Sequence, residues 1–506
     1  MDDNRYTKIN EFPQIIQQLR TSFSEQLTKP IEYRKSQIHQ LYKLVHENEE
    51  PIIQALVKDL SKPKSEILTG ELFVIKQEIT EIVNNLDEWV KPEKVTLPLS
   101  LRMGTSYIRK EPKGTVLIIA PWNYPILLAL SPLIGAIAAG CTVVCKPSEA
   151  VPHCANLLGE LFPKYLDQNA YRLVQGGPAE MTKLLEHRFD HIFYTGSSTI
   201  GKVIMTAAAK HLTSVTLELG GKSPAIVLKD TDISITAKRI IWAKIYNCGQ
   251  TCIAPDYIIC ERSVQSALIE ALTKALSEML GTEIQTNTSY ARIINQRHFD
   301  RIQALVKGTK GRIVVGGDTD RSDLYIAPTV VADVPKGDTL MESEIFGPIL
   351  PILVVDNIDE AIEFVNSGEV PLAFYPFSSN NNTIEYILDR VQSGGVCIND
   401  CLMHGAVPTI PFGGKGNSGM GSYHGKKSFD TFSHERSVLK TPFYIEKALS
   451  VRYPPYTDSK MQLFKWMVLY KKPNFSSTSL LRRIFGSFFL AASTVGVLAF
   501  AMFAFL

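Results

Sequence analysis

The sequence predicts an α/β fold built on a doubly wound parallel sheet. Two observations predict it. Short apolar runs alternate with amphipathic stretches of helical length, and no internal repeat or low-complexity linker interrupts that order. With 506 residues, 45% of them hydrophobic, the chain is long enough for two or three domains with ample cores.

The amino-terminal part is predicted to be helical. Apolar residues recur at helical spacing from about Phe12 to Leu86, for example at Ile38, Leu41 and Val45. We therefore expect several helices before the first strand.

Strands and helices then alternate along the chain. The apolar run 114–120 predicts a buried strand that ends at a proline-rich loop, and a helix is predicted over 127–139. A strand over 142–146, a helix around 155–165 and a strand at 192–194 continue the pattern. This alternation is typical of a parallel sheet with helices on both faces.

Two glycine-rich segments carry reactive side chains. Cys252 ends the run Asn-Cys-Gly-Gln-Thr-Cys at 247–252, and Glu218 opens the run Glu-Leu-Gly-Gly-Lys-Ser-Pro at 218–224. A thiolate can attack a carbonyl carbon, and a carboxylate can later activate the water that releases the product. For either residue alone, a buried structural cysteine or an exposed helical glutamate stays an open alternative.

A third segment favours covalent catalysis. Asn123 lies in the run Pro-Trp-Asn-Tyr-Pro at 121–125, directly after the strand predicted at 114–120. Parallel sheets bind ligands at this end of their strands. The amide of Asn123 can donate to an oxyanion, an interaction worth about 3–4 kcal/mol when it is aimed at developing charge.

These three segments, in this order, resemble the aldehyde dehydrogenase superfamily, and they are most similar to its class 3 or fatty aldehyde dehydrogenase branch. The resemblance extends from about residue 30 to about residue 450. Further motifs support it: Lys-Pro-Ser-Glu at 146–149, Phe-Tyr-Thr-Gly-Ser at 193–197, Glu-Ile-Phe-Gly-Pro at 344–348, and the stretch 411–434.

The resemblance implies an architecture that periodicity alone does not show. It implies an NAD-binding domain at 1–90 and 115–217, and an α/β catalytic domain at 218–405. A small β oligomerisation element would combine 91–114 with 406–450. Because similar class 3 proteins are dimers, we expect a homodimer.

The resemblance also implies the oxidation of an aldehyde to a carboxylic acid. Cys252 is expected to form a thiohemiacetal whose oxyanion is held by Asn123 and by the backbone N–H of Cys252. Hydride transfer to nicotinamide leaves a thioester, and Glu218 then activates water. Tyr124 is expected to contact the substrate. A CoA-acylating dehydrogenase and a catalytically silent scaffold stay open as alternatives, although all three reactive residues are present.

A glycine-containing segment at 195–203 predicts the pyrophosphate site. It nearly matches the phosphate-binding loop G-x-x-x-x-G-K-[ST], but Val203 stands where that loop needs a hydroxyl. We therefore expect Gly196, Ser197 and Gly201 at the amino end of a helix that faces a dinucleotide.

The remaining cofactor residues follow from the family motifs. Lys146 and Glu149 are expected at the adenine-side ribose, and Glu344 and Phe346 at the nicotinamide end. Glu149 favours NAD, because a 2′-phosphate would meet like charge. Lys146 has the opposite effect, so NADP stays possible.

Composition argues against several other functions. The net charge of +2, without basic runs interleaved with aromatics, argues against nucleic-acid binding. Eight irregularly spaced cysteines fit a reducing compartment, and no metal site is expected. Cys248, four residues before Cys252, is predicted to be either a small buried side chain or a partner in reversible oxidation.

The carboxyl terminus differs from the rest of the chain. Residues 484–506 carry no charge, and at about 1.5 Å per residue they can cross a hydrocarbon core of about 30 Å. Arg482 and Arg483 precede this run, which predicts a tail anchor with a cytosolic catalytic body. A buried carboxyl-terminal helix is the alternative.

Residues 451–483 are predicted to contain a juxtamembrane amphipathic helix. Such a helix either covers the mouth of an apolar tunnel or lies on the membrane surface. A protein held at lipid favours long-chain aliphatic aldehydes as substrates, with aromatic aldehydes as the second choice. The endoplasmic reticulum is the expected membrane, with the mitochondrial outer membrane and lipid droplets as alternatives.

Overall fold

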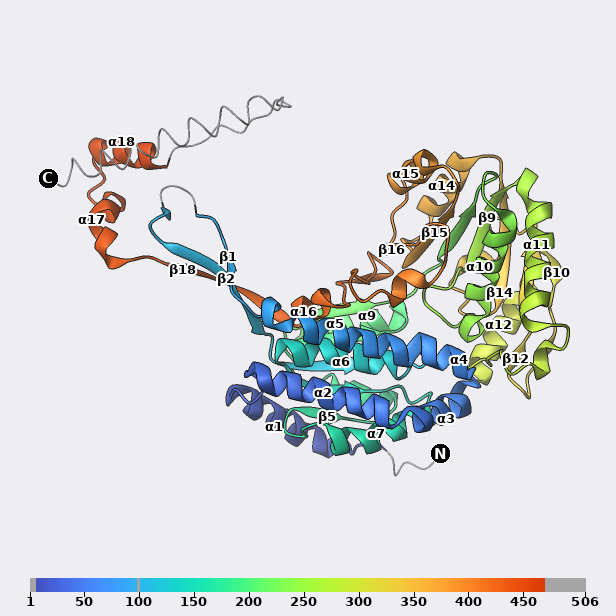
Figure 1. Cartoon of the computed structure of the whole chain (residues 1–506), viewed down its shortest axis with the longest axis horizontal. Coiled ribbons are helices and arrows are strands. Elements are labelled where there is room, and N and C mark those ends of the chain that lie inside the picture. The colour runs from blue at the N-terminus through green and yellow to red at the C-terminus, as the bar shows by residue number, and fades with distance from the viewer. Residues whose placement is uncertain (1–5, 98–100, 469–506) are drawn as a thin grey trace. The chain divides into compact units, whose positions relative to one another are not determined.

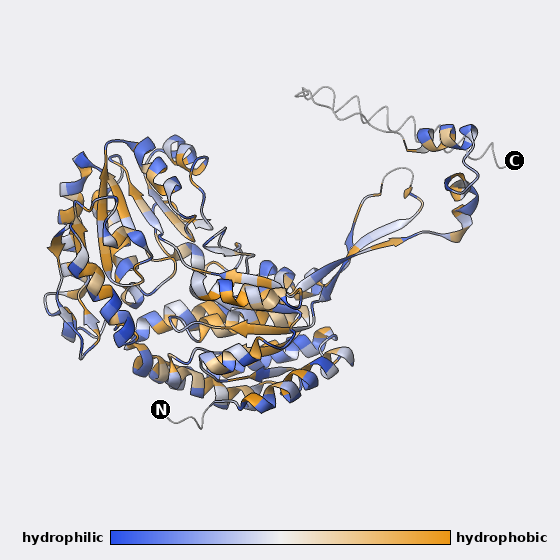
Figure 2. Cartoon of the chain, turned by 180° about the vertical axis from the view of Figure 1, so that it is seen from behind, coloured by the Kyte–Doolittle hydropathy of each residue, from blue (hydrophilic) through white to orange (hydrophobic). Residues whose placement is uncertain are grey.

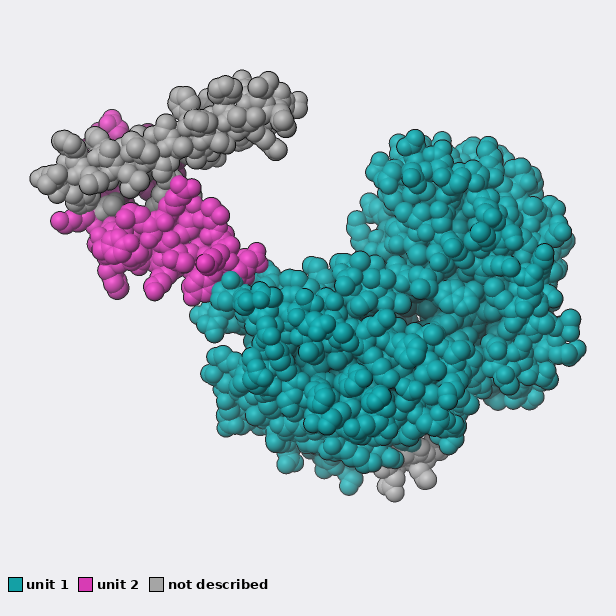
Figure 3. Space-filling view, in the orientation of Figure 1, with its two compact units in different colours: residues 1–92, 109–436 teal, residues 93–108, 437–506 magenta. Residues whose placement is uncertain are grey.

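The computed structural model describes residues 6–97 and 101–468. The chain divides into two compact units, one of residues 1–92 and 109–436 and one of residues 93–108 and 437–506 (Figure 3). The predicted membrane span at 484–506 and the end of the predicted amphipathic segment lie outside the described residues. Within the described ranges, no helix combines the length and the apolar character needed to cross a bilayer.

The first part of the larger unit is helical, as the periodicity predicted. A π-helical turn at Leu68–Leu72 joins the fourth helix to the fifth. The helices are α1 (Phe12–Ser24), α2 (Ile31–Glu47), α3 (Glu49–Leu60), α4 (Lys64–Ile67) and α5 (Phe73–Trp89).

A six-stranded sheet forms the first core of this unit. The strands are β17 (Gly419–Met420), β7 (Ser214–Glu218), β6 (His191–Thr195), β3 (Thr115–Ile119), β4 (Thr142–Lys146) and β5 (Tyr171–Leu173), in that spatial order. All neighbours pair in parallel except β17, which runs antiparallel to β7. The strands predicted at 114–120, 142–146 and 192–194 are therefore confirmed.

Helices cover both faces of this sheet (Figure 1). They are α6 (Leu127–Ala139), α7 (Pro152–Tyr165), α8 (Pro178–Leu184) and α9 (Ser198–Ala209), together with α1 to α5. On β3, Val116 and Ile118 pack into the core that contains α6, whereas Leu117 and Ile119 pack into the core that contains α1 and α9. Because successive strand residues face opposite sides, this alternation shows a doubly wound sheet.

A second sheet of seven strands forms the other core. Its order is β10 (Arg312–Val315), β13 (Thr329–Ala332), β14 (Ile349–Val355), β9 (Tyr257–Glu261), β8 (Pro224–Val227), β15 (Ala373–Phe377) and β16 (Gly395–Val396). Only the β10–β13 pairing is antiparallel. The strands of both large sheets are mostly hydrophobic in colour, as buried parallel strands should be (Figure 2).

Helices and one short hairpin complete the second half of the larger unit. The helices are α10 (Ile233–Ile245), α11 (Arg262–Leu280), α12 (Gln296–Gly308), α13 (Thr339–Glu342), α14 (Ile358–Ser367) and α15 (Asn381–Leu388), whereas α16 (Lys426–Thr431) packs against α5 and α6 in the first core. The hairpin pairs β11 (Thr319–Asp320) with β12 (Tyr325–Ile326).

A three-stranded sheet contributes to the smaller unit. Its order is β1 (Glu93–Lys94), β2 (Thr105–Pro112) and β18 (Ser433–Lys440), so β18 is an edge strand. Up to residue 468, where the described part of the chain ends, the helices α17 (Glu446–Leu449) and α18 (Asp458–Met467) follow. Helix α18 lies within the predicted amphipathic segment, and its Met461 and Phe464 are exposed.

Candidate active site

Cys252 follows a sharply turned segment after α10. Asn247, Cys248 and Gly249 all have left-handed backbone conformations, with φ of 51°, 54° and 70°. For residues other than glycine this conformation costs roughly 1–2 kcal/mol each. At Gly249 a Cβ would lie 2.3 Å from the carbonyl oxygen of Gly347, so only glycine fits. The sequence 247–252 is therefore held in a specific, strained turn.

Buried polar contacts hold this turn in place. The Glu66 carboxylate accepts from the Asn247 backbone N–H at 2.8 Å. The Gln250 side chain donates to the carbonyl oxygens of Asn247 (3.0 Å) and Arg292 (2.9 Å). Cys248 is buried and donates its S–H to the Tyr290 hydroxyl, which matches the prediction of a small buried side chain.

The Cys252 sulfur lies in an environment that disfavours its charged form. Desolvation raises the thiol pKa, and the carboxyl groups of Glu344 and Glu218 raise it further. Backbone N–H groups of Cys252 and Ile253 act in the opposite direction. Cys252 and Cys397 are the only partly exposed cysteines among the eight, all of which lie in the described ranges. Cys252 is thus accessible, and its proton needs an acceptor.

Asn123 lies beside the nucleophile turn. The residue is buried, four positions beyond the end of β3, and its Nδ2 donates to the carbonyl oxygen of Gln250 at 3.0 Å. An amide nitrogen carries two hydrogens, so one remains for a ligand. The prediction that Asn123 follows a strand end is confirmed, and its position next to the Cys252 segment suits an oxyanion donor.

Glu218 is the last residue of β7 and is only 2% exposed. Neither of its carboxylate oxygens has a hydrogen-bond partner within residues 6–97 and 101–468. Burial raises its pKa well above the ordinary value. Its charge also contributes to the raised pKa of Cys252, so the two groups interact electrostatically. An unpartnered buried carboxyl group beside a thiol is a candidate for proton transfer.

The edge strand β17 closes this part of the site. Gly419 pairs with Glu218, and the Leu219 N–H donates to the Ser418 carbonyl. Tyr423 is buried, and its pKa is raised chiefly by desolvation and further by the charges of Glu218 and Cys252. The stretch 411–434 was singled out only by its resemblance to a family, because no local pattern showed that it returns to β7.

The loop between β6 and α9 has the geometry expected of a pyrophosphate site. Gly196 makes the turn, Ser197 caps the helix by accepting from the Ile200 N–H, and Gly201 packs against Leu219. On the outer face of α9, Ile200 and Val203 lie one turn apart and are exposed. An apolar surface next to a helix amino terminus fits the adenine and phosphates of a dinucleotide.

Lys146 and Glu149 form an ion pair at the carboxyl end of β4. The Lys146 Nζ lies 2.6 Å from Glu149 Oε2, and the lysine is buried whereas the glutamate is exposed. The exposed Glu149 carboxylate is thus already paired with the charge of Lys146. This arrangement can accept hydrogen bonds from ribose hydroxyls.

Glu344 lies against the glycine-rich segment after β7. A Cβ on Gly220 would come within 2.1 Å of the Glu344 carboxylate, so the close approach requires glycine. Burial raises the Glu344 pKa to about 8, and the nearby Asp256 also raises it. Phe346 packs edge-on against Trp122, with ring centroids 5.3 Å apart. Phe346, one of the two residues predicted at the nicotinamide end, thus contacts the loop that carries Asn123.

A cavity of about 460 Å³ lies beside part of this site. Among its lining residues are Ser198, Gly220, Gly221 and Glu344. The structure therefore brings the α9 amino terminus and Glu344 to one cavity, whereas Lys146, Glu149 and Cys252 are not among its lining residues. In the part of the chain that the structure describes, no cluster of three or more His, Cys, Asp or Glu side chains could hold a metal ion.

Tyr124 has a buried side chain that bonds to the nucleophile segment. Its hydroxyl shares a 2.8 Å hydrogen bond with Thr251, the residue before Cys252. Lys62 Nζ lies 4.0 Å from the centre of its ring. Contact of Tyr124 with substrate stays a prediction. His424 is buried and His404 is half-buried, and desolvation lowers the pKa of both to about 4, in keeping with neutral histidines.

Comparisons with known proteins point to one family. The model of the "Aldehyde dehydrogenase family" matches residues 5–438. The chain is 48% identical to aldehyde dehydrogenase family 3 member A2 of Macaca fascicularis over 454 residues, 90% of this chain and 93% of that protein.

Solved structures show the same similarity. Substrate-bound AldH of Staphylococcus aureus superposes with a TM-score of 0.87 at 43% identity, covering 90% of this chain and 98% of that one. A Mycobacterium tuberculosis aldehyde dehydrogenase complexed with NAD+ has a TM-score of 0.79 at 27% identity, covering 86% and 90%.

Proposed function

This chain belongs to the aldehyde dehydrogenase family, and we propose that it oxidises long-chain aliphatic aldehydes to carboxylic acids at a membrane surface. It is an NAD(P)+-dependent aldehyde dehydrogenase of the class 3 branch. The observation that carries the catalytic assignment is the unpartnered, buried Glu218 carboxyl group beside the Cys252 sulfur.

In the proposed acylation step, Cys252 attacks the aldehyde carbon. The Cys252 proton first passes to solvent, the thiolate then forms the carbon–sulfur bond, and the carbonyl oxygen becomes an oxyanion. The free hydrogen on Asn123 Nδ2 and the Cys252 backbone N–H stabilise that oxyanion. Buried hydrogen bonds hold both the Asn123 side chain and the turn before Cys252, so these donors need little reorganisation during the reaction.

In the proposed deacylation step, Glu218 removes a proton from water, and the hydroxide displaces the acyl group from Cys252. The raised pKa of Glu218 suits a base, because a carboxylate with high proton affinity accepts the proton more readily. This argument supports hydrolysis over acyl transfer to CoA.

The cofactor residues fit an NAD-binding role. When bound, the dinucleotide supplies the hydride acceptor that converts the Cys252 adduct into a thioester. Gly196, Ser197 and Gly201 shape the helix end that would receive the phosphates, and Glu344 would accept from the nicotinamide ribose. The Lys146–Glu149 pair supports NAD over NADP, because its lysine is already neutralised and less available to a 2′-phosphate.

An exposed aliphatic surface supports the long-chain substrate. Five apolar side chains from the end of β16 to the segment before β17 are exposed: Val396, Ile398, Met403, Val407 and Ile410. Their segment approaches the nucleophile, since a Cβ on Gly405 would lie 2.8 Å from Ile253 Cδ1. Such a surface can hold an alkyl chain at about 0.8 kcal/mol per buried methylene.

A chain-length series tests the substrate assignment. We expect kcat/KM to rise from acetaldehyde to hexadecanal, because each added methylene gains binding energy until the surface is filled. The measurement is the initial rate of NADH formation across the series, with benzaldehyde as the aromatic comparison. A flat profile, or benzaldehyde as the best substrate, contradicts the assignment.

Deleting residues 484–506 tests the membrane anchor that we propose. The truncated protein is expected to stay in the supernatant after membranes are pelleted, with kcat for a short aldehyde unchanged. The reason is that the deleted run carries the uncharged residues and none of the site residues. A truncated protein that still pellets with membranes contradicts the proposal. We favour the endoplasmic reticulum, with the mitochondrial outer membrane and lipid droplets as alternatives.

We also propose a homodimer. Most residues of the edge strand β18 are exposed, and the aromatic side chains of Phe443 and Tyr444 beyond it are 97% and 77% exposed. Long exposed edge strands are usually paired or covered in soluble proteins, which supports pairing with a second copy.

A further inference from the structure

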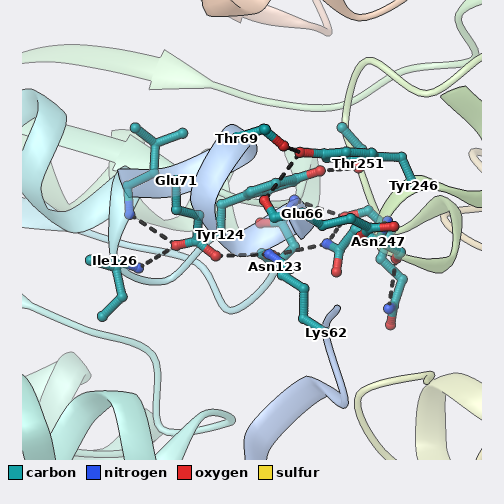
Figure 4. A network of polar contacts seen from close by, with 12 residues as sticks. Lys62, Glu66, Thr69, Glu71, Asn123, Tyr124, Ile126, Tyr246, Asn247 and Thr251 are labelled. Atoms are coloured by element: carbon teal, nitrogen blue, oxygen red, sulfur yellow. Dashed lines mark hydrogen bonds and ion pairs between the residues drawn. The ribbon is translucent and has the colours of Figure 1, made fainter. Parts of the chain in front are cut away.

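A buried ion pair lies beneath the loop that carries Asn123 (Figure 4). Lys62 Nζ and Glu71 Oε1 are 2.8 Å apart, and both side chains are fully buried. Lys62 follows α3, and Glu71 lies in the π-helical turn after α4. Neither residue belongs to a motif that indicated chemistry.

The pair holds both ends of the loop. Lys62 Nζ donates to the Asn123 carbonyl oxygen at 3.0 Å. Glu71 Oε2 accepts from the backbone N–H groups of Ile126 (3.0 Å) and Leu127 (3.1 Å), which begin α6. The loop from 123 to 127 is thus fixed at its start by a cation and at its end by a carboxylate.

The Asn123 carbonyl joins this pair to the nucleophile turn. Besides Lys62, the same oxygen accepts from Asn247 Nδ2 at 2.9 Å. Asn247 Nδ2 also contacts the Gln250 carbonyl, which in turn accepts from Asn123 Nδ2. Lys62 therefore holds the backbone carbonyl of Asn123, the residue whose side chain contacts the Cys252 segment.

Stability does not explain why the pair is ionic. Burying two charges costs solvation energy, and apolar residues of similar volume often serve a fold equally well. A cation and a carboxylate do supply directed contacts to three backbone groups. Such contacts fix position, and displacing a catalytic group by about 1 Å can cost about 10²-fold in rate.

We propose that Lys62 and Glu71 are positioning residues that aim the Asn123 amide at the oxyanion. The proposal rests on the oxyanion role proposed above for Asn123. Lys62 touches no substrate atom in this assignment and acts only through the Asn123 peptide group.

A double-mutant cycle tests the proposal. In the full-length enzyme, Lys62→Met is expected to lower kcat by roughly 10- to 100-fold, with the KM values for aldehyde and NAD changed less than about threefold. In the Asn123→Ala background the same substitution is expected to change kcat by less than about twofold, because the group it positions is gone.

A matched control separates positioning from general damage. Arg34 is also buried, and it donates to the Ala138 carbonyl (3.1 Å) near the other end of α6. Arg34→Met is expected to leave kcat within about twofold. The double variant Lys62→Met/Glu71→Gln removes both charges, so it serves if Lys62→Met alone does not fold, and it is expected to show the same dependence on Asn123.

The outcomes are distinct. Wild-type kcat in Asn123→Ala overturns the oxyanion assignment and this proposal with it. If Asn123→Ala is impaired but Lys62→Met is not, only the positioning role fails. An equal fall caused by Lys62→Met in both backgrounds, or an equal fall in Arg34→Met, also overturns the positioning role.

Discussion

Replacing Cys252 by alanine is expected to abolish NADH formation from aldehydes. Without the sulfur no covalent adduct forms, and loss of a covalent nucleophile typically lowers kcat by roughly 10⁴-fold or more. The measurement is the rate of NADH formation at saturating NAD and aldehyde, with NAD binding checked by calorimetry to show an intact site.

Cys248→Ala is the matched control for that experiment. This cysteine lies four residues away, is buried, and bonds to Tyr290. Its replacement is expected to cost stability while kcat stays within about threefold, since no reacting atom is removed. A Cys252→Ala enzyme that keeps most of its rate, or a Cys248→Ala enzyme that loses it, contradicts the assignment of the nucleophile.

Replacing Glu218 by glutamine is expected to stall the enzyme after acylation. The glutamine amide cannot accept a proton from water, and loss of a general base typically costs about 10²- to 10⁴-fold. The first turnover should still release NADH, whereas steady-state kcat falls. Mass spectrometry of enzyme quenched during turnover should then find the acyl mass on the peptide that contains residue 252.

The pH dependence gives a second measure of Glu218. Burial raises its pKa, so its base form increases as pH rises through that pKa. The rate of deacylation of preformed acyl enzyme should therefore rise with pH in the wild type, and this rise should be lost in Glu218→Gln. If the variant keeps the rise, another group is the base. If no acyl mass is ever found, the thioester mechanism is wrong.

The alternation of strands and helices could be predicted closely from the sequence. The helix predicted at 127–139 is α6 without change, and the strand at 142–146 is β4. The helix predicted at 155–165 begins earlier, at Pro152, because proline suits the first turn of a helix. The existence and order of these elements were predictable because the hydrophobic period is a local property of the sequence.

Candidate site residues were predictable where they lie in compact motifs. Cys252, Glu218 and Asn123 each occur beside glycine or proline, whose backbone effects mark unusual turns. Their proximity to one another was not visible in the sequence. It depends on contacts between distant segments, such as the hydrogen bond from Asn123 Nδ2 to the carbonyl oxygen of Gln250.

The sequence by itself determined which groups can react and where the chain turns, because thiol, carboxyl and amide chemistry and glycine conformations belong to single residues. Only the tertiary structure decided the proton affinity and the position of these groups. Glu218 becomes a strong proton acceptor through desolvation by distant segments. Lys62 contacts Asn123, which lies 61 residues further along the chain. A contact between such distant residues has no local sequence pattern, so the sequence could not predict it.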